Sequence, residues 1–256
     1  MGDTIGLRLM RRYASPYASS FSFGPGPLST TLKALIGANV VMFLIVTVVP
    51  SLQLTLGLMP SAVVRNLHVW QLVTYMFVHA GVFHLLFNML VLWMIGSELE
   101  RMWGRRYFLK FYFVTGVGAA ALTVVFSLLP FGFASALYPS VIVGASGAIF
   151  GLLLAYALYF PDRLIYMYFL FPIKVKYFVA ILGAIELYSS LAVMNGIASA
   201  THLGGLLVGY LYLKGARIDP LSEMKYRFLK WKINRARKKF DVYSGGRTDD
   251  WNHRVH

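Results

Sequence analysis

Long apolar stretches dominate this chain and constrain its fold more than any other feature. The hydrocarbon core of a bilayer is about 30 Å thick, so a helix that crosses it needs about 20 apolar residues. The stretches that approach this length cover residues 35–56, 84–99, 108–129, 146–160, 177–193 and 202–213. The second, fourth and sixth are short, and we interpret them as helices surrounded largely by other helices. Because 58% of the 256 residues are hydrophobic and 13% are charged, we predict an all-α membrane protein with six transmembrane helices.

The distribution of basic residues predicts the orientation of these helices. Cytoplasmic connections of membrane proteins are enriched in Lys and Arg. Here the basic residues gather in both tails and in the connections after the second and fourth stretches, and of 24 such residues only Arg65 falls elsewhere. The connections 130–145 and 194–201 contain no charge. We therefore predict that both termini are cytoplasmic and that the first connection, residues 57–83, faces the opposite side.

Composition also bears on partners and cofactors. A net charge of +14 would suggest nucleic acid for a soluble protein, but membrane topology accounts for it here, and we expect no nucleic-acid partner. The chain has no cysteine, which excludes a disulfide framework, a thiolate metal site and a cysteine nucleophile. We expect neither a cofactor nor a metal.

The chain divides into three predicted parts. Residues 1–32, rich in Ser, Gly and Pro, are expected to be a disordered cytoplasmic tail, residues 33–214 the six-span core, and residues 215–256 a basic cytoplasmic tail. The basic tail suggests contact with anionic lipids. The N-terminal part lacks the apolar core of a signal peptide, and we expect a multi-pass protein of a bacterial inner membrane.

Five polar residues inside the apolar stretches are singled out as candidates, because polar groups at membrane depth are costly and usually serve a function. They are His84, Asn88, Ser146, Glu186 and His202. The predicted topology places all of them except Glu186 at non-cytoplasmic helix ends, in one layer of the membrane. Glu186 lies mid-stretch, and we interpret it as a structural hydrogen-bonding group at greater depth. We therefore expect no acidic residue beside His202.

Ser146 and His202 together would support nucleophilic catalysis. A serine hydroxyl is a poor nucleophile unless a base takes its proton, and histidine is the usual base. The oxyanion that forms then needs prearranged donors, for which the Ser146 amide, His84 and Asn88 are available in the same layer. His84 and Asn88 are spaced i, i+4 and so share one helix face. We predict a Ser–His dyad whose site opens on the non-cytoplasmic side.

Glycines flank both predicted catalytic residues: Gly144 and Gly147 lie beside Ser146, and Gly205 and Gly209 follow His202. The first pair lets the backbone turn tightly into a helix and leaves its first N–H groups unblocked. The second pair, one turn apart, permits close approach of another helix. The expected neighbour is the helix of Ser146, contacted through Gly147 and Gly151.

Three motifs together resemble those of the rhomboid intramembrane serine proteases: HLLFN at 84–88, GASG at 144–147 and HLGGLLVG at 202–209. The resemblance covers about residues 35–213. It implies a rhomboid-like six-helix bundle in which Ser146 is the nucleophile and His202 the general base. It also implies that His84, Asn88 and the Ser146 amide form the oxyanion hole. Substrates would be single-span membrane proteins with small or helix-destabilising residues near the outer surface.

Four further positions are interpreted through this resemblance. His79 matches a histidine that the family often has beneath the first loop. Glu100 resembles an acidic residue at the cytoplasmic end of the second span, expected to bond to the following turn. Gln71 stands where many members have arginine, and Phe150 where bacterial members often have tyrosine. We expect Phe150 to stack on the ring of His202.

Two other functions are alternatives. A non-catalytic rhomboid-like protein would bind membrane helices, but such relatives lack the dyad that is present here. A small transporter or channel would also place polar residues beside glycine breaks. However, no inverted repeat is visible, and the polar layer lies away from the membrane midplane.

Overall fold

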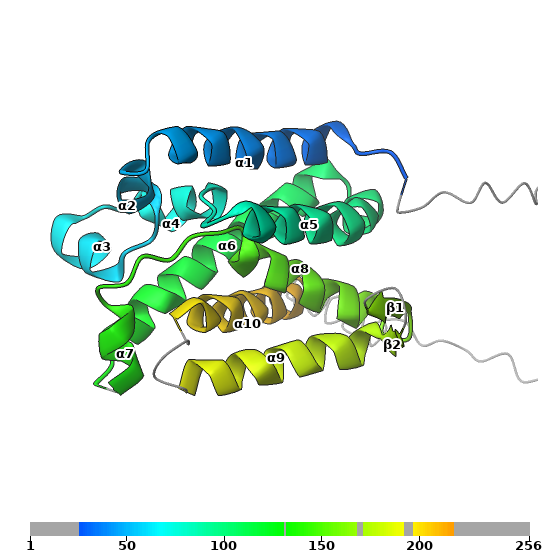
Figure 1. The fold of residues 1–256 in the computed structure, drawn as a ribbon. Coiled ribbons are helices and arrows are strands. Elements are labelled where there is room, and N and C mark those ends of the chain that lie inside the picture. The colour runs from blue at the N-terminus through cyan, green and yellow to red at the C-terminus, as the bar shows by residue number, and fades with distance from the viewer. Residues whose placement is uncertain (1–25, 131, 168–170, 192–196, 218–256) are drawn as a thin grey trace, which may run out of the picture. The chain divides into compact units, whose positions relative to one another are not determined.

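The computed structural model describes residues 26–130, 132–167, 171–191 and 197–217, and this part of the chain is predominantly helical (Figure 1). The elements are, in order, α1 (Thr30–Val48), α2 (Leu52–Leu56), α3 (Pro60–Asn66), α4 (Gln71–Thr74), the 3₁₀ helix η3 (Tyr75–Phe77), α5 (Val82–Trp103), α6 (Arg105–Ser127), α7 (Gly132–Leu137), α8 (Ser146–Tyr159), β1 (Leu164–Met167), β2 (Phe171–Lys174), α9 (Val175–Leu191) and α10 (Ile197–Arg217).

Each predicted apolar stretch overlaps one of the longer helices, namely α1, α5, α6, α8, α9 and α10. Within the described residues, α1, α5 and α6 are long and apolar enough to cross a membrane, and α8 is a shorter apolar helix. Many of the side chains on these helices are apolar and exposed, as expected for surfaces that face lipid.

Several predicted boundaries are wrong. The first stretch was predicted to be one helix through residue 56, but α1 ends at Val48 because Pro50 disfavours a helical residue before it. The helix of the second stretch is longer than predicted and ends at Trp103, followed by Gly104, whose φ of 77° favours glycine. The last helix begins at Ile197, so His202 lies in its second turn and not at its start.

The predicted tails are described only in part. Helix α1 begins at Thr30, capped by the Ser29 hydroxyl, which accepts from the Leu32 N–H at 3.1 Å. Helical structure therefore starts inside the predicted N-terminal tail of residues 1–32. The remainder of that prediction, residues 1–25, lies outside the described residues, as does residue 218 onward of the predicted basic tail.

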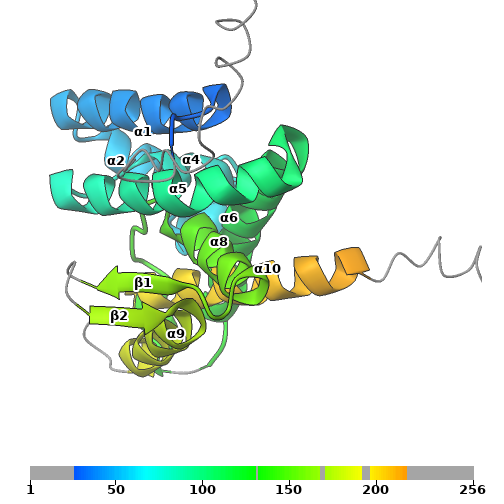
Figure 2. The same ribbon diagram turned by 90° about the vertical axis from the view of Figure 1, so that its right-hand side faces the viewer.

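Helix α8 lies among other helices and packs against α5, α6 and α9. Figures 1 and 2 show α1 and α9 on opposite sides of it. The contact with α6 is close because Gly151 has no side chain: a Cβ there would lie 2.8 Å from Cβ of Thr115. Burial from several sides agrees with the interpretation of this short stretch as a helix surrounded by protein.

The chain between α1 and α5 is a folded loop containing α2, α3, α4 and η3, and Gln71 anchors it. The Gln71 side chain is fully buried, and its Oε1 accepts from the Met59 N–H at 3.0 Å. Its Nε2 donates to the carbonyls of Leu54 and Thr55 at 3.3 and 3.2 Å. One amide thus satisfies three backbone groups of the loop, although this position departs from the arginine of many family members.

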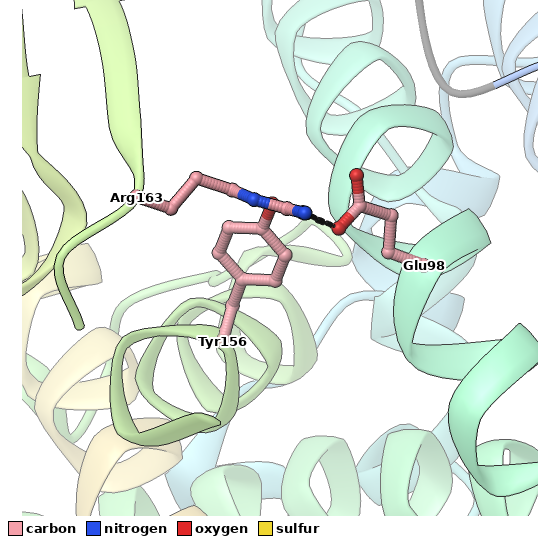
Figure 3. A network of polar contacts seen from close by, with 3 residues as sticks. All are labelled: Glu98, Tyr156 and Arg163. Carbon is pink, nitrogen blue, oxygen red and sulfur yellow. Dashed lines mark hydrogen bonds and ion pairs between the residues drawn. The ribbon is translucent and has the colours of Figure 1, made fainter. Parts of the chain in front are cut away.

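A polar network ties the C-terminal part of α5 to the C-terminal part of α8 (Figure 3). The Tyr156 hydroxyl donates to Glu98 Oε2 at 3.0 Å, and Arg163 pairs with the same carboxylate. Two residues further along α5, Glu100 accepts a hydrogen bond from the Ser29 hydroxyl at the start of α1. The Glu100 side chain therefore bonds to α1, which differs from the expected bond to the following turn.

The antiparallel hairpin of β1 and β2 was not predicted from the sequence. Its register pairs Leu164 with Lys174 and Met167 with Phe171. Figure 2 shows the hairpin beside α9, whose first residue follows β2 directly. Asp162 precedes the hairpin and pairs with Lys174 and Lys176 at 3.1 and 2.9 Å.

Candidate active site

The position predicted to be the nucleophile, Ser146, is the first residue of α8. The chain enters the helix through Gly144, whose φ of 124° is a conformation that side chains rarely allow. The Gly144 N–H donates to the Tyr75 carbonyl at 2.9 Å, which holds the turn in place. No side chain caps the start of α8, so this end offers N–H groups to a negatively charged group.

The His202 ring lies directly against Ser146, with Nε2 at 2.8 Å from the serine Oγ. This is the separation that proton transfer from a hydroxyl to a base requires. The His202 side chain is 16% exposed, so the pair is largely shielded. The structure thus brings together the two residues that the sequence analysis paired, from positions 56 residues apart.

Glycine contacts explain why α8 and α10 approach so closely. A Cβ at Gly205 would lie 2.0 Å from the carbonyl oxygen of Gly147. One turn further, a Cβ at Gly209 would lie 3.1 Å from Cα of Gly151. The predicted crossing of these two helices at their glycines is therefore confirmed.

The ring of Phe150 fixes the plane of the histidine. Phe150 lies one turn after Ser146 on α8, and its ring stacks on that of His202 with centroids 4.4 Å apart and an interplanar angle of 6°. The expected stacking is present, and a phenyl ring supplies it without a hydroxyl.

One supporting contact was not singled out from the sequence. Thr201, directly before His202, is buried, and its hydroxyl lies 2.9 Å from that of Thr123 on α6. This hydrogen bond ties the second turn of α10 to a neighbouring helix. The available signal was a threonine inside one apolar stretch and another directly before the last stretch, a pattern that is too common in membrane proteins to be specific.

His84 and Asn88 lie in the first two turns of α5, near the turn that leads to Ser146. A Cβ at Gly144 would lie 2.8 Å from Nε2 of His84. His84 Nδ1 accepts from the Ala80 N–H at 3.4 Å, so the neutral ring carries its proton on Nε2. Asn88 donates one N–H to the His84 carbonyl at 2.8 Å, and its side chain has a second N–H. The His84 ring therefore offers a donor beside the turn into α8, and Asn88 lies one turn further along α5.

His79 supports His84 from beneath the first loop. It is 2% exposed, and its ring meets that of His84 edge-on with centroids 5.0 Å apart. Burial, with a smaller contribution from the neighbouring His84, lowers the pKa of His79 to about 4. His79 is therefore neutral at physiological pH.

The expectation that no acidic residue lies beside His202 is wrong. Glu186 Oε1 lies 2.9 Å from His202 Nδ1, the ring nitrogen that faces away from Ser146. The error arose because the membrane depth of Glu186 was estimated from its position along the apolar stretch. That position does not show how far α9 is tilted or shifted along its axis relative to its neighbours. Helix α9 packs so that its residue 186 reaches the same level as Ser146.

Comparison with known proteins agrees with the motifs. A family model described as a rhomboid domain matches residues 66–216. This chain belongs to the rhomboid family. Rhomboid membership and the apolar helices together make it an integral membrane protein.

Individual rhomboid relatives show how far the similarity extends. The chain is 38% identical over 143 residues to the rhomboid protease GluP of Bacillus subtilis (strain 168), covering 55% of this chain and 25% of the relative. It is 31% identical over 161 residues to RHOMBOID-like protein 4 of Arabidopsis thaliana, covering 63% and 37%. It is 30% identical over 151 residues to the rhomboid protease AarA of Providencia stuartii, covering 56% and 54%. The matches thus span from a quarter to about half of these relatives.

Proposed function

We propose that this rhomboid protein is an intramembrane serine endopeptidase that hydrolyses peptide bonds in or near the transmembrane segments of other membrane proteins. The observation that supports this proposal most directly is the 2.8 Å separation between Ser146 Oγ and His202 Nε2. Relatives named rhomboid proteases agree with it.

The proposed mechanism follows from the geometry of the site. His202 Nε2 accepts the proton of the Ser146 hydroxyl as Oγ attacks the scissile carbonyl, and later returns that proton to the leaving amine. The oxyanion is stabilised by the Ser146 amide and by the side-chain donors of His84 and Asn88. Water then hydrolyses the acyl–enzyme ester. The glycines 144, 147, 205 and 209 and the ring of Phe150 hold the two reacting side chains in register.

We also propose six membrane spans with both termini cytoplasmic, in a bacterial inner membrane. The contacts of Glu98 and Glu100 bring the start of α1, the end of α5 and the end of α8 to one end of the bundle. Arg163 lies at that end, whereas the start of α5 and the start of α8 lie at the other end, with the site. Placing the basic end in the cytoplasm satisfies the positive-inside rule.

The absence of cysteine gives a direct test of this topology. Single cysteines replacing Asn66 on α3 or Arg106 on α6, both exposed, would be labelled in intact cells with a membrane-impermeant maleimide. We expect labelling at Asn66→Cys before lysis and at Arg106→Cys only after it. The reverse order would refute the proposed orientation.

The proposed function is tested by cleavage of single-span membrane proteins in liposomes, including substrates with small residues near the outer surface. We expect Ser146→Ala to abolish cleavage while the thermal unfolding temperature changes little, because the substitution removes one oxygen atom from a small, partly buried side chain. His202→Ala should abolish cleavage as well. A serine-directed fluorophosphonate should label the wild type and not Ser146→Ala. If the wild type cleaves no more than Ser146→Ala, the protease is excluded. Retention of transmembrane peptides by the same two proteins would then favour a membrane-helix binding function.

A further inference from the structure

Glu186 on α9 lies beside His202 Nδ1, the ring nitrogen that takes no part in the proposed proton transfer with Ser146. Its Oε1 lies 2.9 Å from His202 Nδ1, and the two side chains are 17% and 16% exposed. The opposite nitrogen, Nε2, lies 2.8 Å from Ser146 Oγ. Hydroxyl, imidazole and carboxylate therefore follow one another in the order Oγ, Nε2, Nδ1, Oε1, across the helices α8, α10 and α9.

This order has a chemical consequence for the histidine. To accept a proton from Ser146, a neutral ring must have its lone pair at Nε2 and its proton at Nδ1. A carboxylate beside Nδ1 favours that tautomer and stabilises the imidazolium that forms when the serine proton arrives. The carboxylate stays ionised throughout, so the serine proton moves only between Oγ, Nε2 and the leaving amine.

The contact is electrostatic in its present geometry. Among the described residues, no hydrogen bond is directed at the buried His202 Nδ1, and Glu186 Oε1 lies within ion-pair distance of it. Phe150 holds the plane of the His202 ring. A linear hydrogen bond between Nδ1–H and the carboxylate would therefore require the Glu186 side chain to rotate. We therefore expect a smaller contribution than that of a fully aligned carboxylate.

We propose that Glu186 is a positioning residue that completes a Ser–His–Glu triad by orienting His202 and stabilising its protonated form. This proposal rests on the proposed protease function. From the sequence alone, Glu186 is interpreted as a structural group. In that role Glu186 would stabilise the contact between α9 and α10 without affecting the protonation of His202, whereas a positioning residue affects that protonation.

The test compares Glu186→Gln and Glu186→Asp with wild type, using the liposome cleavage reaction and purified full-length protein. Ile185→Ala is the matched control, because Ile185 is the preceding residue of α9 and its side chain is 53% exposed. We expect Glu186→Gln to lower kcat by roughly 10²-fold, within the range for loss of acid–base assistance, with little change in KM. Glu186→Asp should recover part of the loss, and Ile185→Ala should behave as wild type.

The activity–pH profile separates positioning from packing. The groups that contact the His202 ring are Ser146 and Phe150 from α8 and Glu186 from α9. The nearest titratable group on α5 is His84, which lies beside Gly144 at the turn into α8. Removing the negative charge makes the imidazolium less favourable. The acid limb of the Glu186→Gln profile should therefore move to lower pH, with the thermal unfolding temperature as a check on folding.

The outcomes distinguish this proposal from the function on which it rests. If Ser146→Ala abolishes cleavage while Glu186→Gln retains the wild-type kcat and acid limb, the triad is refuted and the protease stands. If Glu186→Gln and Glu186→Asp lose activity equally, in proportion to lost stability and with an unmoved acid limb, Glu186 has only a packing role. Cleavage that does not depend on Ser146 would overturn both proposals.

Discussion

Replacing Gly205 with alanine tests the helix crossing that brings the proposed catalytic pair together. The new Cβ would lie 2.0 Å from the Gly147 carbonyl oxygen, whereas close carbon–oxygen contacts in proteins lie at about 3.3 Å. Because the obstructing atom belongs to backbone and not to a flexible side chain, α8 and α10 must separate locally by about 1.3 Å, the difference between these distances.

The expected effect on activity exceeds the effect on stability. Overpacking of this kind costs about 1–3 kcal/mol of folding free energy. The same displacement lengthens the 2.8 Å separation between Ser146 Oγ and His202 Nε2, and a misplacement of about 1 Å lowers catalytic rates by roughly 10²-fold. Gly205→Ala should therefore remain folded and lose about two orders of magnitude in kcat.

The measurement is cleavage of a single-span substrate in liposomes together with thermal unfolding of the same preparation. Gly37→Ala is the matched control, because Gly37 also lies within a helix but a Cβ there meets no atom within 4 Å. We expect Gly37→Ala to keep wild-type activity and stability. If Gly205→Ala cleaves as well as Gly37→Ala, the close crossing of α8 and α10 is refuted.

Two further predictions concern the first loop. Gln71→Ala should destabilise the protein by about 1–3 kcal/mol, because it removes the side-chain partner of the Met59 N–H and of the Leu54 carbonyl, whereas the Thr55 carbonyl still accepts from Trp70 Nε1. Limited proteolysis should then cut residues 57–70 faster than in Val73→Ala, whose parent side chain is exposed. Burial lowers the pKa of His79 from 6.5 to about 4 in the folded protein, so the unfolded chain binds a proton more readily. The contribution of neutral His79 to the free energy of unfolding is therefore complete above about pH 6.5 and declines as pH falls toward 4. At pH 5 the loss amounts to about 2 kcal/mol. The stability of His79→Gln, measured by thermal unfolding between pH 7 and pH 4.5, should fall less steeply than that of wild type, and equal slopes would contradict this assignment.

The sequence by itself determined the class of the protein and the identity of the paired residues. Apolar stretches of sufficient length require helices in a membrane, because lipid cannot satisfy backbone polar groups. The glycines at 147 and 205 predicted a close crossing, since only glycine permits backbone contact at such distances, and this crossing brings Ser146 to His202. These features depend on local composition and spacing, which the sequence records directly.

The tertiary structure decided which polar side chains come into contact, because such contacts depend on how far neighbouring helices are shifted along their axes relative to one another. Glu186 lies mid-stretch in the sequence, and only the packing of α9 places its carboxylate 2.9 Å from His202 Nδ1. Gln71 likewise had no visible partners, because its three hydrogen bonds run to residues 12–17 positions earlier in a folded loop. The pattern of apolar residues shows that a helix is buried. The relative position of two packed helices along their axes, however, is set by the shapes of both contacting surfaces. A contact between a single polar pair therefore emerges only when those surfaces are packed together.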